Sequence, residues 1–159
     1  MPRIYTDANP RMIAYLIEDG DSGYQHLPVE VSAMEAEYMA IIYGLNEFFL
    51  RWNRELDARQ ADMTRESLAE AKRKELAGEV TDPFFGAGSP SDKTKRPLPP
   101  PIMILSDNEV VVKQLSRQFH IGNDRLRKLA QNIWNMTKNL EVLYQWTPRK
   151  QNKAGYMLK

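Results

Sequence analysis

The middle of this 159-residue chain is too polar to form part of a hydrophobic core, and this constrains the fold most. Residues 54–79 are rich in Arg, Glu, Ala and Lys and predict a solvated helix. Residues 81–101 are rich in Gly, Ser, Pro and Lys and predict an extended stretch. Neither flanking half has a complete core alone, so we expect one domain, residues 1–159, with an insertion at about 52–100. The sequence leaves open whether the insertion docks on the domain, binds a protein partner or does neither.

Composition excludes several classes of protein. Apolar residues make up 42% of the chain, enough for a core, but no long uncharged apolar run occurs, so we expect no membrane span. The N-terminus lacks the layout of a signal peptide. The absence of cysteine excludes disulfides, thiolate zinc sites and a cysteine nucleophile, and fits a cytoplasmic protein, which we expect to be a monomer. Because the net charge is only +1, any nucleic-acid surface must be a local patch.

The hydrophobic pattern on either side of the insertion predicts strands and helices in one sheet-containing fold. Apolar runs bounded by turn residues predict strands, and apolar residues at helical spacing predict helices. One helix begins near Ser32, where Glu35 completes a capping box. The expected strands are 3–6, 12–17, 24–31, 102–105 and 140–146, and the later helices are 108–119, 124–138 and a short one in the tail. The order β-β-β-α-(insertion)-β-α-α-β-α describes a mixed sheet with helices packed on it.

Two of the expected strands end alike, each running apolar residues into a hydroxyl residue and then an aspartate. Asp7 ends Ile-Tyr-Thr-Asp, and Asp107 ends Ile-Leu-Ser-Asp. If the two strands are neighbours, their carboxylates can share a divalent cation. Each aspartate also has a purely structural interpretation, in which Asp7 opens the Asp-Ala-Asn-Pro turn and Asp107 caps the next helix.

Glu37 lies on the helical stripe that we expect to face the sheet. The stripe includes Ala40 and Gly44, two small residues that would allow the helix to approach the sheet closely. A carboxylate on such a stripe must be paired, protonated or bound to a metal. No Lys or Arg on the neighbouring strands is an obvious partner. A cation shared with Asp7 and Asp107 would provide the positive partner that the Glu37 carboxylate requires. Ligation by carboxylates alone favours Mg²⁺ or Mn²⁺ over zinc.

The surroundings of these three acids resemble the carboxylate motifs of type 1 ribonucleases H. Asp7 lies in Ile-Tyr-Thr-Asp, Glu37 in Glu-Ala-Glu-Tyr-Met-Ala-Ile-Ile-Tyr-Gly-Leu, and Asp107 in Leu-Ser-Asp-Asn-Glu-Val-Val-Val-Lys-Gln-Leu. The tail Trp-Thr-Pro-Arg-Lys-Gln-Asn-Lys-Ala-Gly is similar to the family's last strand and following loop. The resemblance covers most of the chain outside the insertion. It implies a ribonuclease H-like α/β fold, with a mixed five-stranded sheet and helices on both faces.

The resemblance also implies an enzyme, a metal-dependent endonuclease that hydrolyses the RNA strand of RNA–DNA hybrids. Asp7, Glu37 and Asp107 would hold two Mg²⁺ ions, for which Mn²⁺ is a possible substitute. One ion would help to generate the attacking hydroxide, and the other would stabilise the leaving 3′-oxygen. The implied products carry a 5′-phosphate and a 3′-hydroxyl.

The fourth acid of the family is missing from this sequence. Matching Asn152 to the family's Asn-x-x-Ala-Asp motif puts Gly155 and Tyr156 at the Ala-Asp positions. A weaker metal site, replacement by another carboxylate such as Glu109, a truncated chain or low activity would each account for the loss. The alternative function is a non-catalytic nucleic-acid-binding module of the same fold.

The residues expected to contact nucleic acid also depart from the family. Ser32-Ala33-Met34 replaces the asparagines that help to sense RNA 2′-hydroxyls, which keeps open a related nuclease acting on DNA. Arg149 is expected near the phosphate because guanidinium binds phosphate oxygens well, although it has an equally simple interpretation as an ordinary exposed arginine. The full set of expected nucleic-acid contacts is Ser32, Lys113, Arg149, Lys150 and Asn152.

Overall fold

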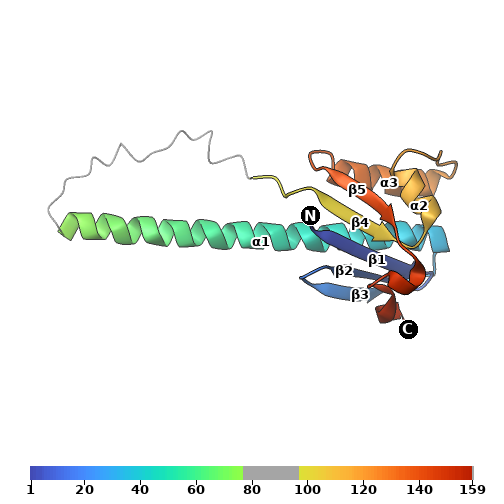
Figure 1. The fold of residues 1–159 in the computed structure, drawn as a ribbon, viewed down its shortest axis with the longest axis horizontal. Coiled ribbons are helices and arrows are strands. Elements are labelled where there is room, and N and C mark those ends of the chain that lie inside the picture. The colour runs from blue at the N-terminus through green and yellow to red at the C-terminus, as the bar shows by residue number, and fades with distance from the viewer. Residues whose placement is uncertain (77–96, 159) are drawn as a thin grey trace. The chain divides into compact units, whose positions relative to one another are not determined.

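A computed structural model describes residues 1–76 and 97–158 of the chain (Figure 1). The chain divides into two compact units, Met1–Phe49 with Pro99–Lys159, and Leu50–Leu98. Most of the stretch predicted to be extended, residues 81–101, lies outside the described residues.

A five-stranded sheet forms the centre of the first unit. Its strands are β1 (Arg3–Asn9), β2 (Met12–Ile17), β3 (Ser22–His26), β4 (Ile102–Ser106) and β5 (Val142–Trp146). They lie in the order β3-β2-β1-β4-β5, with β1, β2 and β3 antiparallel and β1, β4 and β5 parallel. Thr6 of β1 pairs with Ser106 of β4. The aspartates that follow these two residues therefore start from adjacent positions in the sheet.

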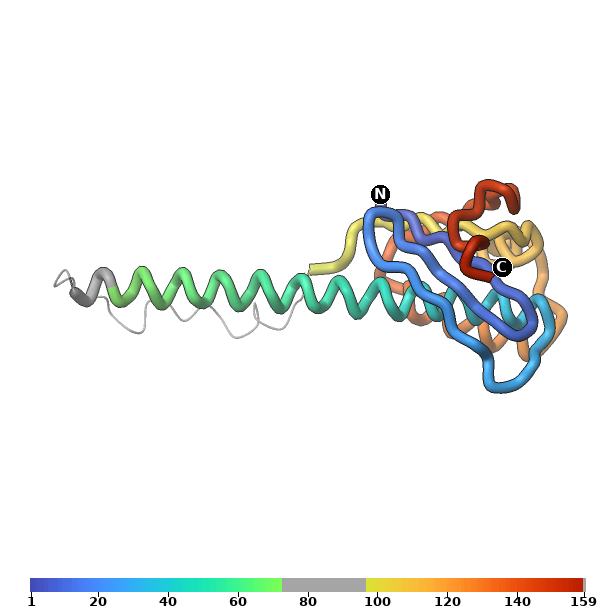
Figure 2. Tube along the Cα trace, turned by 90° about the horizontal axis from the view of Figure 1, so that it is seen from below, coloured from blue at the N-terminus to red at the C-terminus, as the bar shows by residue number. Residues whose placement is uncertain are grey.

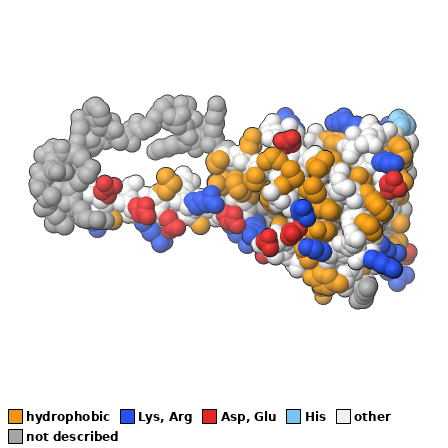
Figure 3. All heavy atoms as spheres, in the orientation of Figure 1, with side chains coloured by type: hydrophobic (Ala, Val, Ile, Leu, Met, Phe, Trp, Pro, Cys, Tyr) orange, Lys and Arg blue, Asp and Glu red, His pale blue; other side chains and the backbone are white. Residues whose placement is uncertain are grey.

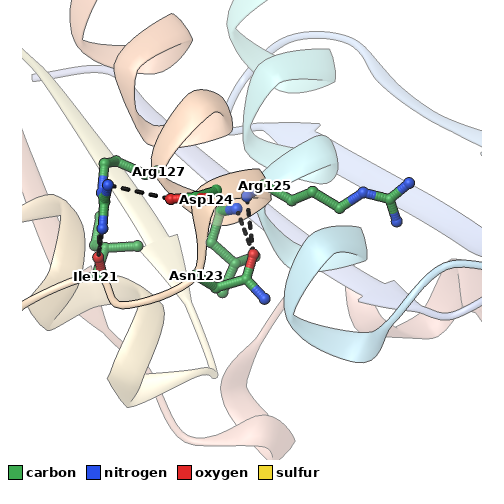
Figure 4. A network of polar contacts seen from close by, with 6 residues as sticks. Ile121, Asn123, Asp124, Arg125 and Arg127 are labelled. Carbon is green, nitrogen blue, oxygen red and sulfur yellow. Dashed lines mark hydrogen bonds and ion pairs between the residues drawn. The ribbon is translucent and has the colours of Figure 1, made fainter.

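Three helices begin at side-chain caps that the sequence provides. They are α1 (Ala33–Leu76), α2 (Glu109–Leu115) and α3 (Asp124–Met136). The Ser32 hydroxyl accepts a hydrogen bond from the backbone N–H of Glu35 at 3.1 Å, so the predicted N-cap of α1 is present. Asn123 caps α3 by accepting from two backbone N–H groups of its first turn, and Arg127 is held by Asp124 and the Ile121 carbonyl (Figure 4).

The sheet is covered on both faces, as predicted for an α/β fold (Figures 1 and 2). Ile4 and Ile104 point to the face on which the beginning of α1, α2 and α3 pack, and this face contains the larger core. Tyr5 and Leu105 point to the opposite face, where the C-terminal segment covers them. That segment consists of two short 3₁₀ helices, η2 (Arg149–Gln151) and η3 (Gly155–Leu158).

Strand β3 and helix α2 each end several residues earlier than predicted, for local reasons. β3 ends at His26 instead of residue 31 because Pro28 has no N–H group, and the backbone N–H of Leu27 donates instead to the Arg11 carbonyl. α2 ends at Leu115 instead of residue 119 because Arg117 adopts a φ of 64°, which is incompatible with a continuing helix.

The second unit is described for residues 50–76 and 97–98, and α1 runs through it without a break. The helix is stabilised locally by an Arg51–Glu55 ion pair of 3.2 Å. The Trp52 indole N–H donates to the Pro97 carbonyl at 3.3 Å, so the two ends of this segment meet. No helix in the described part of the chain is long and apolar enough to cross a membrane.

Candidate active site

Three carboxylates from three separate elements converge at one end of the sheet. Asp7 lies in β1, Asp107 directly follows β4, and Glu37 lies in the first turns of α1. One carboxylate oxygen from each residue lies within 4.8 Å of the other two. The three acids predicted from the sequence are therefore brought together, at a spacing that one divalent cation can bridge.

Two asparagines near the aspartates accept the turn and helix-cap hydrogen bonds that the structural interpretation assigned to Asp7 and Asp107. The Asn9 side chain accepts the turn hydrogen bond, from the Arg11 N–H at 2.9 Å. The Asn108 side chain caps α2 by accepting from the Val111 N–H at 3.2 Å. The interpretation of Asp107 as a helix cap is therefore wrong, because the residue after it does that work. Asp7 Oδ1 accepts a hydrogen bond from the backbone N–H of Ala8 at 2.9 Å, and Asp107 is hydrogen-bonded to the Asn152 side chain.

Glu37 is almost fully buried although it carries a carboxylate. Its side chain is 6% exposed, and its Oε2 atom is buried without a hydrogen-bond partner. The helix can bring it there because Gly44, two turns on, packs directly on β1 and β2. A Cβ at Gly44 would lie 3.1 Å from Ile4 Cγ2 and 3.2 Å from Tyr15 Cβ. An unpartnered buried carboxylate oxygen costs free energy unless a cation or proton satisfies it.

Burial raises the pKa of all three carboxyl groups, and repulsion between carboxylates adds to this for Asp7 and Glu37. Burial, followed by the Asp107 charge, raises the pKa of Asp7 to about 6. Burial, followed by the charges of Asp107 and Asp7, raises the pKa of Glu37 to about 9. Burial also raises the pKa of Asp107. The Arg149 guanidinium lowers all three pKa values, so it lies close enough to interact electrostatically with each of the three carboxylates.

The loop after β5 is fixed to the ends of both aspartate strands. At its start, the Thr147 N–H donates to the Ser106 carbonyl at 2.9 Å. At its end, the buried Asn152 side chain donates to the Thr6 carbonyl at 2.8 Å. Arg149 lies between these two anchors, so its backbone is held beside the acids.

An open pocket of about 510 Å³ adjoins the cluster on the side of this loop. Asp7 is the one acidic side chain in its lining. Positive charge comes from Arg149 and Lys150, and Tyr156 adds an aromatic ring. On the face seen in Figure 3, Lys and Arg side chains are scattered among apolar ones. The pocket therefore combines a carboxylate edge with a local cationic wall, which suits a phosphate next to a bound cation.

The five predicted nucleic-acid contacts separate into two groups. Arg149, Lys150 and Asn152 line the pocket. Lys113 does not line it; its ammonium group lies 3.0 Å from Glu109 and 5.0 Å from the centre of the Phe119 ring. Ser32 is exposed and caps α1.

Two residues near the acids were not predicted to belong to the site. The buried Ser106 hydroxyl is hydrogen-bonded to Glu37, and this bond lowers the glutamate's pKa. The Trp146 indole N–H donates to the Asp107 carbonyl at 3.2 Å, although the ring is 45% exposed. The hydroxyl residue before each aspartate was a visible signal for Ser106, whereas nothing in the pattern of β5 indicated the Trp146 contact.

The donor set fits one divalent cation better than two. Three carboxylates supply the ligands, and the unpartnered Glu37 Oε2 needs a positive partner. At the expected position of a fourth acid, the described residues are Gly155 and Tyr156. A Cβ on Gly155 would lie 3.1 Å from Asp7 Oδ2, and the exposed Tyr156 lines the pocket without a carboxylate.

Comparisons with known proteins agree with this architecture. A family model described as "Reverse transcriptase-like" matches residues 99–158. No curated protein sequence matches the chain.

Solved structures match over nearly the whole chain. LC11-ribonuclease H1 in complex with an RNA/DNA hybrid is 17% identical with a TM-score of 0.62, covering 96% of this chain and 89% of that one. Ribonuclease H1 from the archaeon Halobacterium salinarum is 16% identical with a TM-score of 0.60, covering 99% and 92%. An N-terminal ribonuclease H domain from Mycobacterium tuberculosis is 16% identical with a TM-score of 0.59, covering 95% and 84%.

Sheet order, helix placement and these likenesses lead to one conclusion about the architecture: the chain has a type 1 ribonuclease H-like fold.

Proposed function

We propose that the protein is a metal-dependent endonuclease that hydrolyses the RNA strand of RNA–DNA hybrids. The observation that carries this proposal is the convergence of Asp7, Glu37 and Asp107, with a buried carboxylate oxygen left unpartnered. A protein that only bound nucleic acid would gain nothing from three mutually repelling acids. The likeness to a ribonuclease H1 whose structure contains an RNA/DNA hybrid supports the choice of substrate.

The chemistry needs no nucleophilic side chain from the protein. A divalent cation, for which we propose Mg²⁺ with Mn²⁺ as substitute, supplies Lewis-acid stabilisation of the charge that develops on the phosphate. The chain's own residues would position that phosphate. The three carboxylates would hold the cation, Arg149 in the pocket wall would bind the phosphate, and Asn152 holds the loop against β1. The buried surroundings of Glu37 keep water away from one side of the cluster, which strengthens these interactions.

A second candidate function is a binding module without turnover. The observation that favours it is the pocket position occupied by Tyr156, where a further carboxylate would be expected. In that case the acids would still bind a cation, and the cationic wall would still bind the hybrid.

The deciding experiment is cleavage of an end-labelled RNA–DNA hybrid in Mg²⁺ and in Mn²⁺, beside duplex RNA and duplex DNA. Wild-type protein is expected to cut only the RNA strand of the hybrid, and Asp7→Asn and Glu37→Gln to abolish cutting. Glu141→Gln is the matched control, because it removes an exposed carboxylate at the opposite end of β5.

Other outcomes would select the alternatives. Cutting of duplex DNA would indicate a nuclease of the same fold with a different substrate. Salt-sensitive hybrid binding without cutting in either metal would establish the binding module.

A further inference from the structure

The charges around the pocket are matched for one divalent cation, not for two. One oxygen from each of the three carboxylates lies within 4.8 Å of the other two, and Asp7 is the only acid among the described residues that line the pocket. Three carboxylates, one divalent ion, the Arg149 guanidinium, the Lys150 ammonium group and one phosphodiester group together carry no net charge. A second divalent ion would leave a site with excess positive charge, next to an arginine that already faces the cluster.

Arg149 is placed for this task by the backbone on both sides of it. The loop is bonded to Ser106 through Thr147 and to Thr6 through Asn152, the two residues that directly precede the aspartates. The Asn152 N–H also donates to the Arg149 carbonyl at 3.3 Å. Three hydrogen bonds therefore restrict the arginine to the edge of the cluster, while its side chain lines the open pocket.

No competing partner occupies the guanidinium among the described residues. The ion pairs of the described arginines involve Arg3, Arg11, Arg51, Arg125 and Arg127. Arg149 is instead exposed in the pocket wall, with all five donors available for an anion. A guanidinium presents parallel N–H groups that match two phosphate oxygens, which a point charge such as an ammonium group does not.

We propose that this site works with one divalent cation and that Arg149 supplies the second positive charge by binding the non-bridging oxygens of the phosphate to be cleaved. The inference rests on the proposed hydrolysis of hybrids, and it replaces the two-ion arrangement that the family resemblance implies. It makes Arg149 a catalytic residue, because its guanidinium contacts the reacting phosphate.

The first test counts bound Mn²⁺ on the full chain by calorimetry and electron paramagnetic resonance, with no substrate present. One Mn²⁺ per wild-type chain is expected, and two would overturn the inference. Arg149→Gln is expected to bind Mn²⁺ about three- to tenfold more tightly, since it removes a like charge near the cation. Lys138→Gln is the matched control, because it removes one positive charge from the exposed connection between α3 and β5. It should leave the Mn²⁺ affinity unchanged. An unchanged affinity in Arg149→Gln would place the guanidinium too far from the cation and contradict the proposal.

The second test separates kcat from KM on the hybrid. Arg149→Gln is expected to lower kcat about 100-fold, as loss of one charged donor at a reacting centre does, and Arg149→Lys to recover part of it. An effect on KM alone would show an ordinary hybrid contact and overturn the catalytic role. If the wild-type protein cuts no substrate, the proposed function fails separately. The one-ion inference is then still decided by the Mn²⁺ count and affinity.

Discussion

Glu37 is the residue whose environment is hardest to satisfy without a cation. The Ser106 hydroxyl satisfies one side of the carboxylate, and Oε2 has no partner. The protein therefore gives up folding stability at this position, a cost that is recovered when a positively charged ligand binds.

Glu37→Gln should stabilise the cation-free protein at alkaline pH. Burial raises the pKa of Glu37 from 4.5 to about 9, so between these values the folded state holds a proton that the unfolded state has released. Stability from this group is complete below pH 4.5 and is lost as the pH rises through 9. At pH 8 we expect a gain of about 1–3 kcal/mol in the free energy of unfolding for the variant, measured by urea denaturation in EDTA.

The same measurement with saturating Mg²⁺ provides the control. The wild-type protein should then become the more stable of the two, because only its carboxylate binds the ion. A variant that is less stable than wild type in EDTA at pH 8 would contradict the strained environment of Glu37.

Asn152 illustrates a site residue whose task the sequence did not reveal. Its position in the tail suggested contact with nucleic acid, but its buried amide donates to the Thr6 carbonyl and accepts from the Ala154 N–H at 3.2 Å. The arrangement depends on a strand that lies more than 140 residues away, since the two bonded residues are separated by 146 positions. Sequence spacing cannot show such a contact.

Asn152→Ala should therefore act through the strand ends that carry Asp7 and Asp107, not through the substrate. We expect a loss of about 1–3 kcal/mol in stability, because the Thr6 carbonyl is left without its donor. We also expect weaker Mn²⁺ binding in a calorimetric titration. The matched control is Asn139→Ala, an exposed asparagine before β5. Weaker hybrid binding with unchanged stability and Mn²⁺ affinity would instead support a direct nucleic-acid contact.

At the scale of elements, the close packing of α1 on the sheet is what brings Glu37 to the two aspartates. The small residues Ala40 and Gly44 indicated a close approach, and the clearance at Gly44 shows it. The helical spacing of these residues was enough to predict the contact, because a single face of the helix packs on a single face of the sheet. Sequence periodicity was insufficient for β5, where the position predicted to be apolar at Trp146 is 45% exposed, since an edge strand is covered incompletely.

Gly44→Ala should destabilise the protein although alanine favours helices. The added methyl group would lie within 3.2 Å of side-chain atoms on both β1 and β2, so these side chains or the helix must shift by a few tenths of an ångström. We expect a net loss of about 1 kcal/mol, after a gain of about 1 kcal/mol from helix propensity, and a loss of about 3 kcal/mol for Gly44→Val. Thermal unfolding followed by circular dichroism measures both. Cation binding should weaken in the same order, and a stabilised Gly44→Val would contradict the close contact.

At the scale of the whole molecule, the composition of the sequence separates a polar middle segment from two flanking halves that can contribute to a core. The polar composition of the middle segment predicted an insertion at about 52–100, and that prediction still needs an experiment. The contact between Trp52 and Pro97 shows that the two ends of the segment can be joined by a short linker. The role of the segment does not follow from its composition, because charged helices suit many tasks.

Replacing residues 55–94 with a short Gly-Ser linker should leave the remaining chain folded. Loop length affects stability only slowly, so we expect the melting temperature to change by no more than about 5 °C and the Mn²⁺ affinity to stay the same. Differential scanning calorimetry and a Mn²⁺ titration test this. Loss of cooperative unfolding would show that the segment is an essential part of the domain. Loss of hybrid binding alone would assign the segment a substrate-binding role.

The pairing of β1 with β4 also determines when the site can exist. The Thr6 hydroxyl donates to the Leu105 carbonyl, a residue 99 positions later, and the two aspartates follow that pair. A ribosome that has released only the first 76 residues has produced Asp7 and Glu37 but not Asp107. The growing chain therefore cannot form the three-carboxylate site at that stage. The loop between β1 and β4 must close before the site can bind a cation. The proposed binding of a cation would therefore follow the pairing of β1 with β4, and its rate would report the completion of the sheet.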